Sequence, residues 1–300
     1  MLLCTYRPGA YFFEQLDSVL AQSYKAFSLW ISDDSPDDSA ERALDAYRQR
    51  TDDFAFKLVQ GPRKGFAANF LSLICQDGLS ADYYAFCDQD DVWSEEKLEV
   101  AVEALSQYAP DTPAVYCGRT LLTDEEGHVI GYSANWQKKP HFANALVQSL
   151  AGGNTMVLNR SARELVKKAG DASIVSHDWW VYLLVAGAGG HVIFDREPTI
   201  RYRQHDTNLV GANTSLAANL FRIKMLFRNR FRTWNDTNTR ALAPVQHLLT
   251  PENRNRFQSF LNARSGNVIS RLYHLRKSGA YRQTLMGNLG LIIATVIGKI

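Results

Sequence analysis

The feature that most constrains this sequence is the stretch at residues 83–93 (YYAFCDQDDVW). It begins as a short apolar run and then carries three carboxylates within four positions. Strand-forming residues lead into Asp88, Asp90 and Asp91, and helix-forming residues begin at Ser94. A buried strand that turns into a helix in this way places acidic side chains at the carboxyl end of a sheet, where open α/β sheets bind their ligands. The stretch therefore predicts an acidic ligand site in an α/β protein.

The three carboxylates repel one another, and no basic residue follows them before Lys97. Asp88 and Asp90 would face the same side if extended backbone continued through Gln89. A divalent cation would relieve the repulsion, and Mg²⁺ or Mn²⁺ binds well through one or two carboxylates together with substrate phosphates. On this stretch alone, a solvated turn or a helix cap, with Asp91 or Ser94 as the capping residue, is an equally good interpretation.

The first 119 residues alternate between strand-like and helix-like patterns. We predict strands at 1–5, 27–32, 54–59, 83–87 and 113–119, and helices at 10–23, 39–50, 66–75 and 95–108. Successive β-α units predict a mainly parallel, doubly wound sheet with helices on both faces. The chain opens on a strand pattern rather than on a signal peptide. The glycine fingerprints of dinucleotide-binding and P-loop proteins are absent from the sequence.

The next ninety residues contain a predicted hairpin and two glycine-containing junctions. The hairpin covers 121–131, helices are predicted at 142–150, 161–169 and 176–185, and strands at 155–159 and 191–195. Between the first of these helices and the strand that follows it, Gly152 and Gly153 precede Asn154. Paired glycines allow a backbone to approach a ligand closely, although an ordinary helix end would also explain them.

The charge of the chain is divided unevenly. Residues 212–300 hold 14 lysines and arginines against two acidic residues, a net charge of +12, whereas residues 1–211 carry a net charge of −10. We therefore predict two regions, a domain at 1–211 and a basic helical extension at 212–300. A basic segment of this kind suits an anionic membrane surface or nucleic acid, or it packs on the acidic body.

The extension also carries apolar residues at helical spacing. Its stripe is followed by Trp234 and by the uncharged run 284–298, which is too short to span a bilayer comfortably but long enough to lie in its interface. The stripe consists of Leu216, Leu220, Ile223, Phe227 and Phe231. We favour peripheral membrane attachment over packing on the body, and we expect no nucleic-acid partner.

The four cysteines show no metal-type spacing. Cys4, Cys87 and Cys117 lie in strand-like or apolar surroundings, and Cys75 lies near the end of a predicted helix. Buried, reduced thiols in a cytoplasmic protein are the simplest interpretation.

Several motifs, taken in order along residues 1–212, match one family. They are Thr5-Tyr6-Arg7, the helix segment 15–23 (QLDSVLAQS), Ser32-Asp33-Asp34, Asn69-Phe70, residues 87–93 (CDQDDVW), residues 151–156 (AGGNTM), His177-Asp178-Trp179-Trp180 and Tyr202-Arg203-Gln204-His205. In these motifs the chain resembles the inverting, nucleotide-sugar-dependent glycosyltransferases of family two, and within that family the bacterial polysaccharide rhamnosyltransferases. The order and number of the motifs are far more specific than a single Asp-x-Asp match.

The resemblance implies a GT-A fold, a Rossmann-like nucleotide-binding domain, here with a helical C-terminal extension. It implies that Asp88 and Asp90 hold the metal and diphosphate, with His205 as a late ligand, and that Asp178 is the general base. The residues that it assigns to the donor nucleotide are Thr5, Tyr6, Asp33, Asp34, Asn69 and Gln89, beside the two metal-binding aspartates. Those that it assigns to the acceptor are Gly152, Gly153, Asn154, His177, Trp179 and Trp180.

The sequence departs from the family pattern in places. The first strand lacks its usual leading residues, and Arg7 stands where many members have Asn. The Gln-x-x-Arg-Trp signature of processive synthases is absent from the sequence, so we expect one sugar to be transferred per encounter.

The chemistry is consistent with the residues themselves. A glycosyl donor needs its diphosphate leaving group neutralised, and the acceptor hydroxyl needs a base. Asp178 at the start of a helix would have its ionised form favoured by the helix dipole, although a helix cap is the simpler explanation for this residue alone. His177 and His205, taken alone, would be hydrogen-bonded structural histidines.

The leading hypothesis is an inverting glycosyltransferase that moves one sugar, rhamnose from dTDP-rhamnose, to a saccharide or lipid-linked saccharide at the inner face of the cytoplasmic membrane. A UDP-sugar donor stays open. A sugar-1-phosphate nucleotidyltransferase would carry a Gly-rich basic loop where residues 5–9 read TYRPG. A catalytically inactive carbohydrate-binding scaffold would not need Asp88, Asp90, Asp178 and His205 together.

Overall fold

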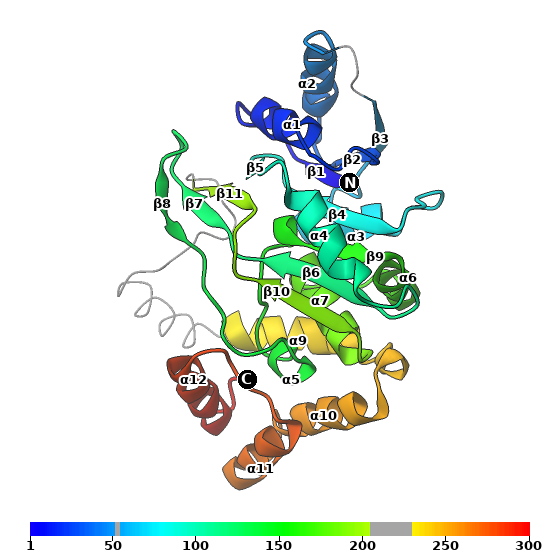
Figure 1. The fold of residues 1–300 in the computed structure, drawn as a ribbon. Coiled ribbons are helices and arrows are strands. Elements are labelled where there is room, and N and C mark those ends of the chain that lie inside the picture. The colour runs from blue at the N-terminus through cyan, green and yellow to red at the C-terminus, as the bar shows by residue number, and fades with distance from the viewer. Residues whose placement is uncertain (52–54, 205–229) are drawn as a thin grey trace.

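The computed structural model describes residues 1–51, 55–204 and 230–300 of the chain (Figure 1). Its central sheet has seven strands in the order β10-β6-β9-β4-β1-β2-β3. Their bounds are β1 Leu2–Thr5, β2 Leu29–Asp33, β3 Phe56–Gln60, β4 Tyr83–Cys87, β6 Ala114–Gly118, β9 Val157–Asn159 and β10 His191–Asp195. All neighbouring pairs are parallel except the two that involve β9, which runs antiparallel to β4 and β6. The predicted mainly parallel sheet is confirmed.

Helices cover both faces of this sheet because successive strand residues point to opposite sides. Leu2 and Phe86 belong to the core beneath α3, α6 and α7, whereas Leu3 and Cys87 belong to the core beneath α1, α2 and α4. The helices are α1 Phe12–Leu20, α2 Ser39–Arg48, α3 Phe66–Ile74, α4 Lys97–Ser106, α6 Arg160–Ala169 and α7 His177–Gly187. Each lies within a range predicted to be helical or extends it by one or two residues.

A second, four-stranded sheet was not predicted from the sequence. Its order is β5-β11-β7-β8, with β5 Val92–Trp93, β7 Leu121–Thr123, β8 Val129–Tyr132 and β11 Ile200–Arg203. The predicted hairpin is present as β7 and β8, which pair antiparallel. β11 pairs with β7 on one side and with β5 on the other. It therefore brings residues 200–203 beside Val92 and Trp93, which directly follow the acidic residues.

The segment after the hairpin differs from the prediction. The helix expected at 142–150 is the single turn α5 Phe142–Ala145, and the short 3-10 turn η1 Gly153–Thr155 leads into β9. The His141 imidazole caps α5 by accepting from the backbone N–H of Ala143 at 3.1 Å.

The C-terminal region is helical, as predicted. Its elements are α9 Arg230–Leu242, η2 Gln246–Leu248, α10 Pro251–Asn262, α11 Val268–Ser278 and α12 Leu285–Val296. Leu242, Phe257 and Phe260 are buried in the same core as α7, so these helices pack on the body. Packing was the less favoured expectation for this region. Of the predicted apolar stripe, only Phe231 lies within the described residues.

Phe231 and Trp234 pack against that core and are half-buried. The indole of Trp234 meets the Trp179 ring edge to face, with ring centroids 6.2 Å apart. The Arg282 guanidinium lies 5.5 Å from the centroid of the Phe231 ring. These contacts use part of both aromatic side chains to pack α9 on the body, and membrane attachment of the extension stays a prediction.

Three of the four cysteines are buried, as their strand-like or apolar surroundings predicted. All four cysteines are free, and Cys4, Cys87 and Cys117 are buried. Burial raises the pKa of each of these three thiols. They serve as small apolar core residues.

Candidate active site at the carboxyl end of the fourth strand

The acidic stretch lies where the sequence predicted it, in the loop between β4 and β5. Extended geometry ends at Cys87, so the expected alternation of Asp88 and Asp90 along one strand does not apply. Burial, and then the negative charges of Asp90 and Asp178, raises the pKa of the Asp88 carboxyl to about 7. Asp178 lies ninety residues further along the chain, yet its charge reaches the Asp88 carboxyl.

The Asp91 side chain is buried, so Asp91 is not part of a solvated turn. It is 1% exposed, and its Oδ2 accepts a hydrogen bond of 2.6 Å from the Asn154 Nδ2 group. Burial, followed by the charges of Asp88 and Asp90, raises the pKa of Asp91 well above its usual range. The helix α4 is capped at Glu96, so neither Asp91 nor Ser94 is its N-cap. Asp91 instead ties the acidic loop to the Gly152–Asn154 segment.

Lys97, the nearest basic residue in sequence, does not neutralise Asp88. Its side chain is fully buried at the start of α4, with Nζ 3.6 Å from the centroid of the Trp93 ring. Burial lowers the pKa of Lys97 to about 7. Its charge acts on Asp91, and it is not among the influences that shift the pKa of Asp88. Lys97 therefore does not offset the effect of the Asp90 charge on Asp88.

Asp178 lies in the first turn of α7, one residue after the helix begins. The N-cap of this helix is Ser176, so the capping explanation for Asp178 does not hold. Its Oδ2 accepts a hydrogen bond of 3.2 Å from the hydroxyl of Ser149. At a helix N-terminus the dipole favours the charged carboxylate, which is the form that accepts a proton.

His177 is a core residue beneath the glycine pair. Its ring is 5% exposed and stacks on Phe70 with centroids 4.0 Å apart, while Phe86 meets it edge to face at 4.8 Å. Burial lowers the pKa of His177 to about 4, so the ring is neutral. A Cβ atom added at Gly153 would stand 1.9 Å from the His177 Nε2 atom. Gly153 is therefore required by close packing within the protein, a reason different from the predicted approach of a ligand.

The two tryptophans predicted at the acceptor site are also buried. Trp179 is 4% exposed and donates from Nε1 to the carbonyl of Ala145 at 2.6 Å, and Trp180 is fully buried. Asn154 has its amide engaged with Asp91. These side chains hold α7 and the η1 turn in place, so any contact with an acceptor would involve the backbone or Asp178.

The predicted nucleotide residues gather at the ends of β1 and β2, next to β4. Thr5 pairs in register with Asp33, and its hydroxyl donates to Asp33 Oδ1 at 2.8 Å. The same oxygen accepts from the Ser35 hydroxyl at 2.7 Å. The Gln89 side chain bonds to both the N–H and the carbonyl of Tyr6, so the β1 loop is fastened to the acidic loop. The Tyr6 ring is 55% exposed beside this seam.

Asp34 and Asn69 are used inside the protein. Asp34 is 6% exposed and accepts from the backbone N–H groups of Arg63 at 2.6 Å and Gly65 at 3.0 Å. The Asn69 amide exchanges two hydrogen bonds with Ser32, one to its hydroxyl and one to its carbonyl. The polar side-chain groups of both residues are engaged in these hydrogen bonds, which shape the loop around the predicted nucleotide-binding residues.

Residues that the sequence reasoning did not assign also belong to the site. The phenol of Tyr202 on β11 lies close enough to the acidic loop that burial and the charges of Asp88, Asp91 and Asp90 raise its pKa. Tyr202 was part of a recognised motif, so that motif was the available signal. Ser149 carried no signal, because its contact with Asp178 depends on the fold of the intervening turn. His205 lies outside the described residues.

The arrangement as a whole fits a divalent cation. Asp88 and Asp90 offer hard oxygen ligands of the type that Mg²⁺ and Mn²⁺ prefer. A further group of potential ligands, Asp124, Glu126 and His128, lies at the tip of the β7–β8 hairpin, with ligand atoms within 4.8 Å of one another. Glu126 and His128 are exposed there.

Comparison with known proteins identifies the family. Residues 2–164 match the model of a family described as "Glycosyl transferase family 2". The chain belongs to glycosyl transferase family 2. It is thus a glycosyltransferase with a nucleotide-sugar donor, as the resemblance of its motifs implied.

Relatives and solved structures agree with this assignment. The chain is 28% identical over 244 residues to the dTDP-rhamnosyl transferase RfbG of Shigella flexneri, covering 76% of this chain and 80% of that protein. It is 26% identical over 227 residues to an uncharacterized glycosyltransferase of Rickettsia typhi, covering 72% of this chain and 66% of that protein.

Two solved structures share the fold. One is the mannosyltransferase PcManGT from Pyrobaculum calidifontis in complex with GDP-Man and Mn²⁺, with TM-score 0.50 and 16% identity, covering 98% of this chain and 73% of that one. The other is residues 1–349 of TarS from S. aureus in complex with UDP-GlcNAc, with TM-score 0.51 and 14% identity, covering 93% and 91%. These likenesses support the predicted GT-A fold.

Among the described residues, no helix is both long enough and apolar enough to cross a membrane.

Proposed function

We propose that this glycosyltransferase is an inverting, metal-dependent enzyme that transfers a single rhamnose from dTDP-rhamnose to a saccharide or lipid-linked saccharide acceptor. We place this reaction in cell-surface polysaccharide synthesis at the inner face of the cytoplasmic membrane. The GT-A domain would comprise residues 1–211, and residues 212–300 would form the extension, of which the described part, 230–300, packs on the body.

The observation that carries the proposal is the meeting of Asp178 with the acidic loop. The Asp178 charge acts on Asp88, although the two residues belong to α7 and to the end of β4. A transferase that inverts its sugar needs two groups on opposite sides of the reacting carbon, one for the leaving diphosphate and one for the attacking hydroxyl. Asp88 with Asp90 suits the first task, and Asp178 suits the second.

Asp88 and Asp90 would hold the Mg²⁺ or Mn²⁺ ion, with His205 as a further ligand. When bound, the ion supplies Lewis-acid neutralisation of the diphosphate. The mannosyltransferase with the same fold was solved with Mn²⁺. In this chain, support for a metal site comes from Asp88, because burial and neighbouring carboxylates raise its pKa to about 7. A bound cation would offset this electrostatic repulsion.

Asp178 would take the proton of the acceptor hydroxyl on its carboxylate. The Ser149 hydroxyl, which donates to Oδ2, would fix the orientation of the carboxylate and leave Oδ1 for the acceptor. Burial of His177, Trp179 and Trp180 would hold the first turn of α7 so that Asp178 keeps its position. Gly152 would contribute backbone rather than a side chain to the acceptor site.

Thr5, Tyr6 and Asp33 would bind the base and ribose of the nucleotide at the end of β1 and β2. Asp33 Oδ1 already accepts two hydroxyl hydrogen bonds, which leaves its other carboxylate oxygen for a pyrimidine N–H. Gln89 would couple this subsite to the metal subsite, because it joins the Tyr6 backbone to the acidic loop. The choice of dTDP over UDP rests on the similarity to the Shigella flexneri enzyme.

The test is a comparison of donors followed by analysis of the product. Binding of dTDP and UDP would be measured by calorimetry with Mn²⁺ present and absent, and transfer from dTDP-rhamnose and UDP-sugars would be followed with saccharide acceptors. NMR of the product would give its anomeric configuration. Retention of the anomeric configuration would refute the inverting mechanism. Activity with UDP-sugars but not with dTDP-rhamnose would refute the proposed donor and would leave the assignment of the site residues unchanged.

A further inference from the structure

The C-terminal helices bury part of their apolar surface against the body and leave part of it uncovered. Asn253 on α10 donates to the carbonyls of Ala186 and Gly187 at the end of α7, both at 3.1 Å. The carbonyl of Tyr281 accepts from Asn144 at 2.9 Å. These buried contacts fix the position of α10 and of the segment between α11 and α12, so the exposed surface of α11 and α12 belongs to a held structure and not to a loose tail.

The helix α12 is apolar on both sides. Its inner side, with Leu291 and Ala294 buried, joins the core. Its outer side exposes a continuous stripe at helical spacing, in which Leu285 is 87% exposed and Met286 is 74% exposed. The stripe consists of Leu285, Met286, Leu289, Ile292, Ile293 and Val296. A helix that is apolar all round is normally buried or in contact with lipid.

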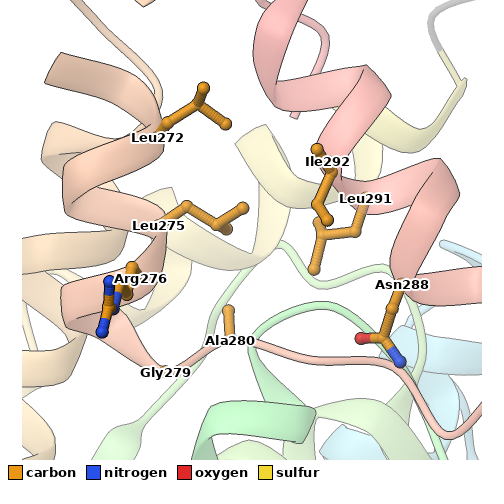
Figure 2. A pocket seen from close by; sticks show the side chains of 8 residues that line it. All are labelled: Leu272, Leu275, Arg276, Gly279, Ala280, Asn288, Leu291 and Ile292. Atoms are coloured by element: carbon orange, nitrogen blue, oxygen red, sulfur yellow. The ribbon is translucent and has the colours of Figure 1, made fainter. Parts of the chain in front are cut away.

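The neighbouring helix α11 continues this surface. Ile269 is 81% exposed and Tyr273 is 61% exposed, one helical turn apart. Between α11 and α12 lies a cavity of ≈ 390 Å³ that is lined mainly by apolar residues, together with Arg276 and Asn288 (Figure 2). Leu275 and Leu291 point toward each other across it, and Ile292 both lines the cavity and belongs to the outer stripe. The cavity is thus continuous with the exposed apolar surface.

The charges on α11, α12 and their flanking residues have a single sign. Residues 265–300 contain five lysines and arginines and no acidic residue, whereas Arg256 and Arg264 on and after α10 form ion pairs with Glu252 and Asp236. Arg276 and Lys277 are exposed at the end of α11, and Arg276 also lines the cavity. A surface that met another protein by apolar contact alone would not need a one-sided charge. Exposed aliphatic side chains beside basic residues fit the boundary between anionic headgroups and acyl chains.

We propose that α11 and α12 form a membrane-docking face that rests on an anionic bilayer, with the α12 stripe entering the acyl boundary, Arg276 and Lys277 meeting acidic headgroups, and the cavity accommodating part of an acyl chain. This inference names the surface behind the proposed membrane location and does not depend on the sugar or the nucleotide. It assigns the contact to α11 and to the uncharged run 284–298, which is one of the two stretches for which the sequence pattern suggested it. Figure 1 shows α11 and α12 at the opposite end of the molecule from α2 and β3.

The experiment is co-sedimentation of the full chain with vesicles of phosphatidylglycerol and phosphatidylcholine, compared with vesicles of phosphatidylcholine alone. No donor, acceptor or metal is present, so the result is independent of transferase activity. We expect sedimentation with the anionic vesicles and weaker binding in high salt. The variant Leu289→Ser with Ile293→Ser should bind these vesicles about tenfold or more weakly, because two exposed aliphatic side chains are lost from the stripe.

The matched apolar control is Val129→Ser with Ile130→Ser. These two side chains on the β8 hairpin are 56% and 58% exposed, against 50% and 48% for Leu289 and Ile293. The control should bind as the unaltered chain does. All four positions are exposed, and equal urea midpoints would establish that every variant is folded.

A second pair tests the charges. Arg276→Ala with Lys277→Ala should weaken binding by about fivefold for each charge removed. Arg42→Ala with Arg48→Ala on α2 removes the same charge from exposed positions far from α12 and should leave binding nearly unchanged.

Absence of vesicle binding, or equal loss in the test and control variants, would overturn the proposal. Light scattering would detect a dimer of the unaltered chain. If Leu289→Ser with Ile293→Ser dissociated such a dimer, the face would bind a second copy of the chain, and this result would overturn the proposal as well.

Discussion

Gly153 offers the most direct test of how the site is built. The prediction is that Gly153→Ala destabilises the protein because the new methyl group has no room. Its Cβ would stand 1.9 Å from His177 Nε2, 2.6 Å from Cε1 and 2.9 Å from Cδ2. The imidazole has little room to shift, since Phe70 stacks on one of its faces with centroids 4.0 Å apart and Phe86 packs edge to face against it at 4.8 Å.

The expected loss follows from overpacking of a rigid site. Inserting a methyl group into a well-packed core costs about 1–3 kcal/mol, and a contact this short among aromatic neighbours belongs at the upper end of that range. For a chain of 300 residues, about 3 kcal/mol corresponds to a melting temperature lower by roughly 5 °C. Urea denaturation followed by circular dichroism would measure the loss directly.

A double-mutant cycle identifies the cause. His177→Ala removes the ring and leaves a void, and in Gly153→Ala with His177→Ala the new methyl group enters that void. The double variant should therefore be more stable than the sum of the single losses predicts, with a coupling of about 2 kcal/mol. Gly9→Ala is the control, because no atom lies within 4 Å of a Cβ added there. Additive losses within 0.5 kcal/mol, or a stable Gly153→Ala, would refute the packing argument.

Four further outcomes follow from the same geometry. Asp178→Asn should lower turnover by about 10²–10⁴-fold with nucleotide affinity and melting temperature nearly unchanged, and retention of most activity would place the base elsewhere. Asp90→Ala should abolish the dependence of nucleotide affinity on Mn²⁺ in calorimetry, and equal affinity with and without Mn²⁺ in the unaltered chain would contradict the shared site. Because the folded pKa of His177 is about 4 and the ordinary value is 6.5, the unfolded chain binds the extra proton first as pH falls. Stability should decline by up to about 3 kcal/mol between pH 6.5 and pH 4, and His177→Ala should decline less over that window in urea titrations. Asp91→Asn keeps an acceptor for Asn154 and should cost less than about 1 kcal/mol, whereas Asp91→Ala leaves the buried amide unpaired and should cost about 1–3 kcal/mol.

The fold could be predicted because its strands and helices carry their own periodicity. Leu2 and Leu3 are both apolar because both faces of β1 are covered, and such runs mark buried parallel strands. The second sheet could not be predicted in the same way. β5 has only two residues, and β11 pairs with β7 across about eighty residues of chain, so neither leaves a local pattern.

The candidate site was only partly readable for a related reason. Asp88, Asp90 and Asp178 stood out as carboxylates at element ends, and their meeting depends on a parallel sheet that the sequence predicted. His177, Trp179 and Trp180 also stood out, yet polar or aromatic character does not say which face of a helix is buried. Ten of the eleven residues of α7 are buried, so its periodicity carries almost no information about orientation.

The acidic triplet illustrates how adjacent residues of one type divide the work. Asp91 is turned inward, where Asn154 and the charge of Lys97 stabilise it, and it anchors the η1 turn to the loop. Asp88 and Asp90 repel each other, and the charge of Asp178 adds to this repulsion. The free-energy cost of the repulsion falls when a cation binds there together with a diphosphate. Binding should therefore be cooperative. A cation lowers the repulsion between the carboxylates, and the anionic diphosphate binds well only beside that cation, so each should raise the affinity for the other. Loop position, more than the number of carboxylates, therefore decides which of the three can bind a ligand.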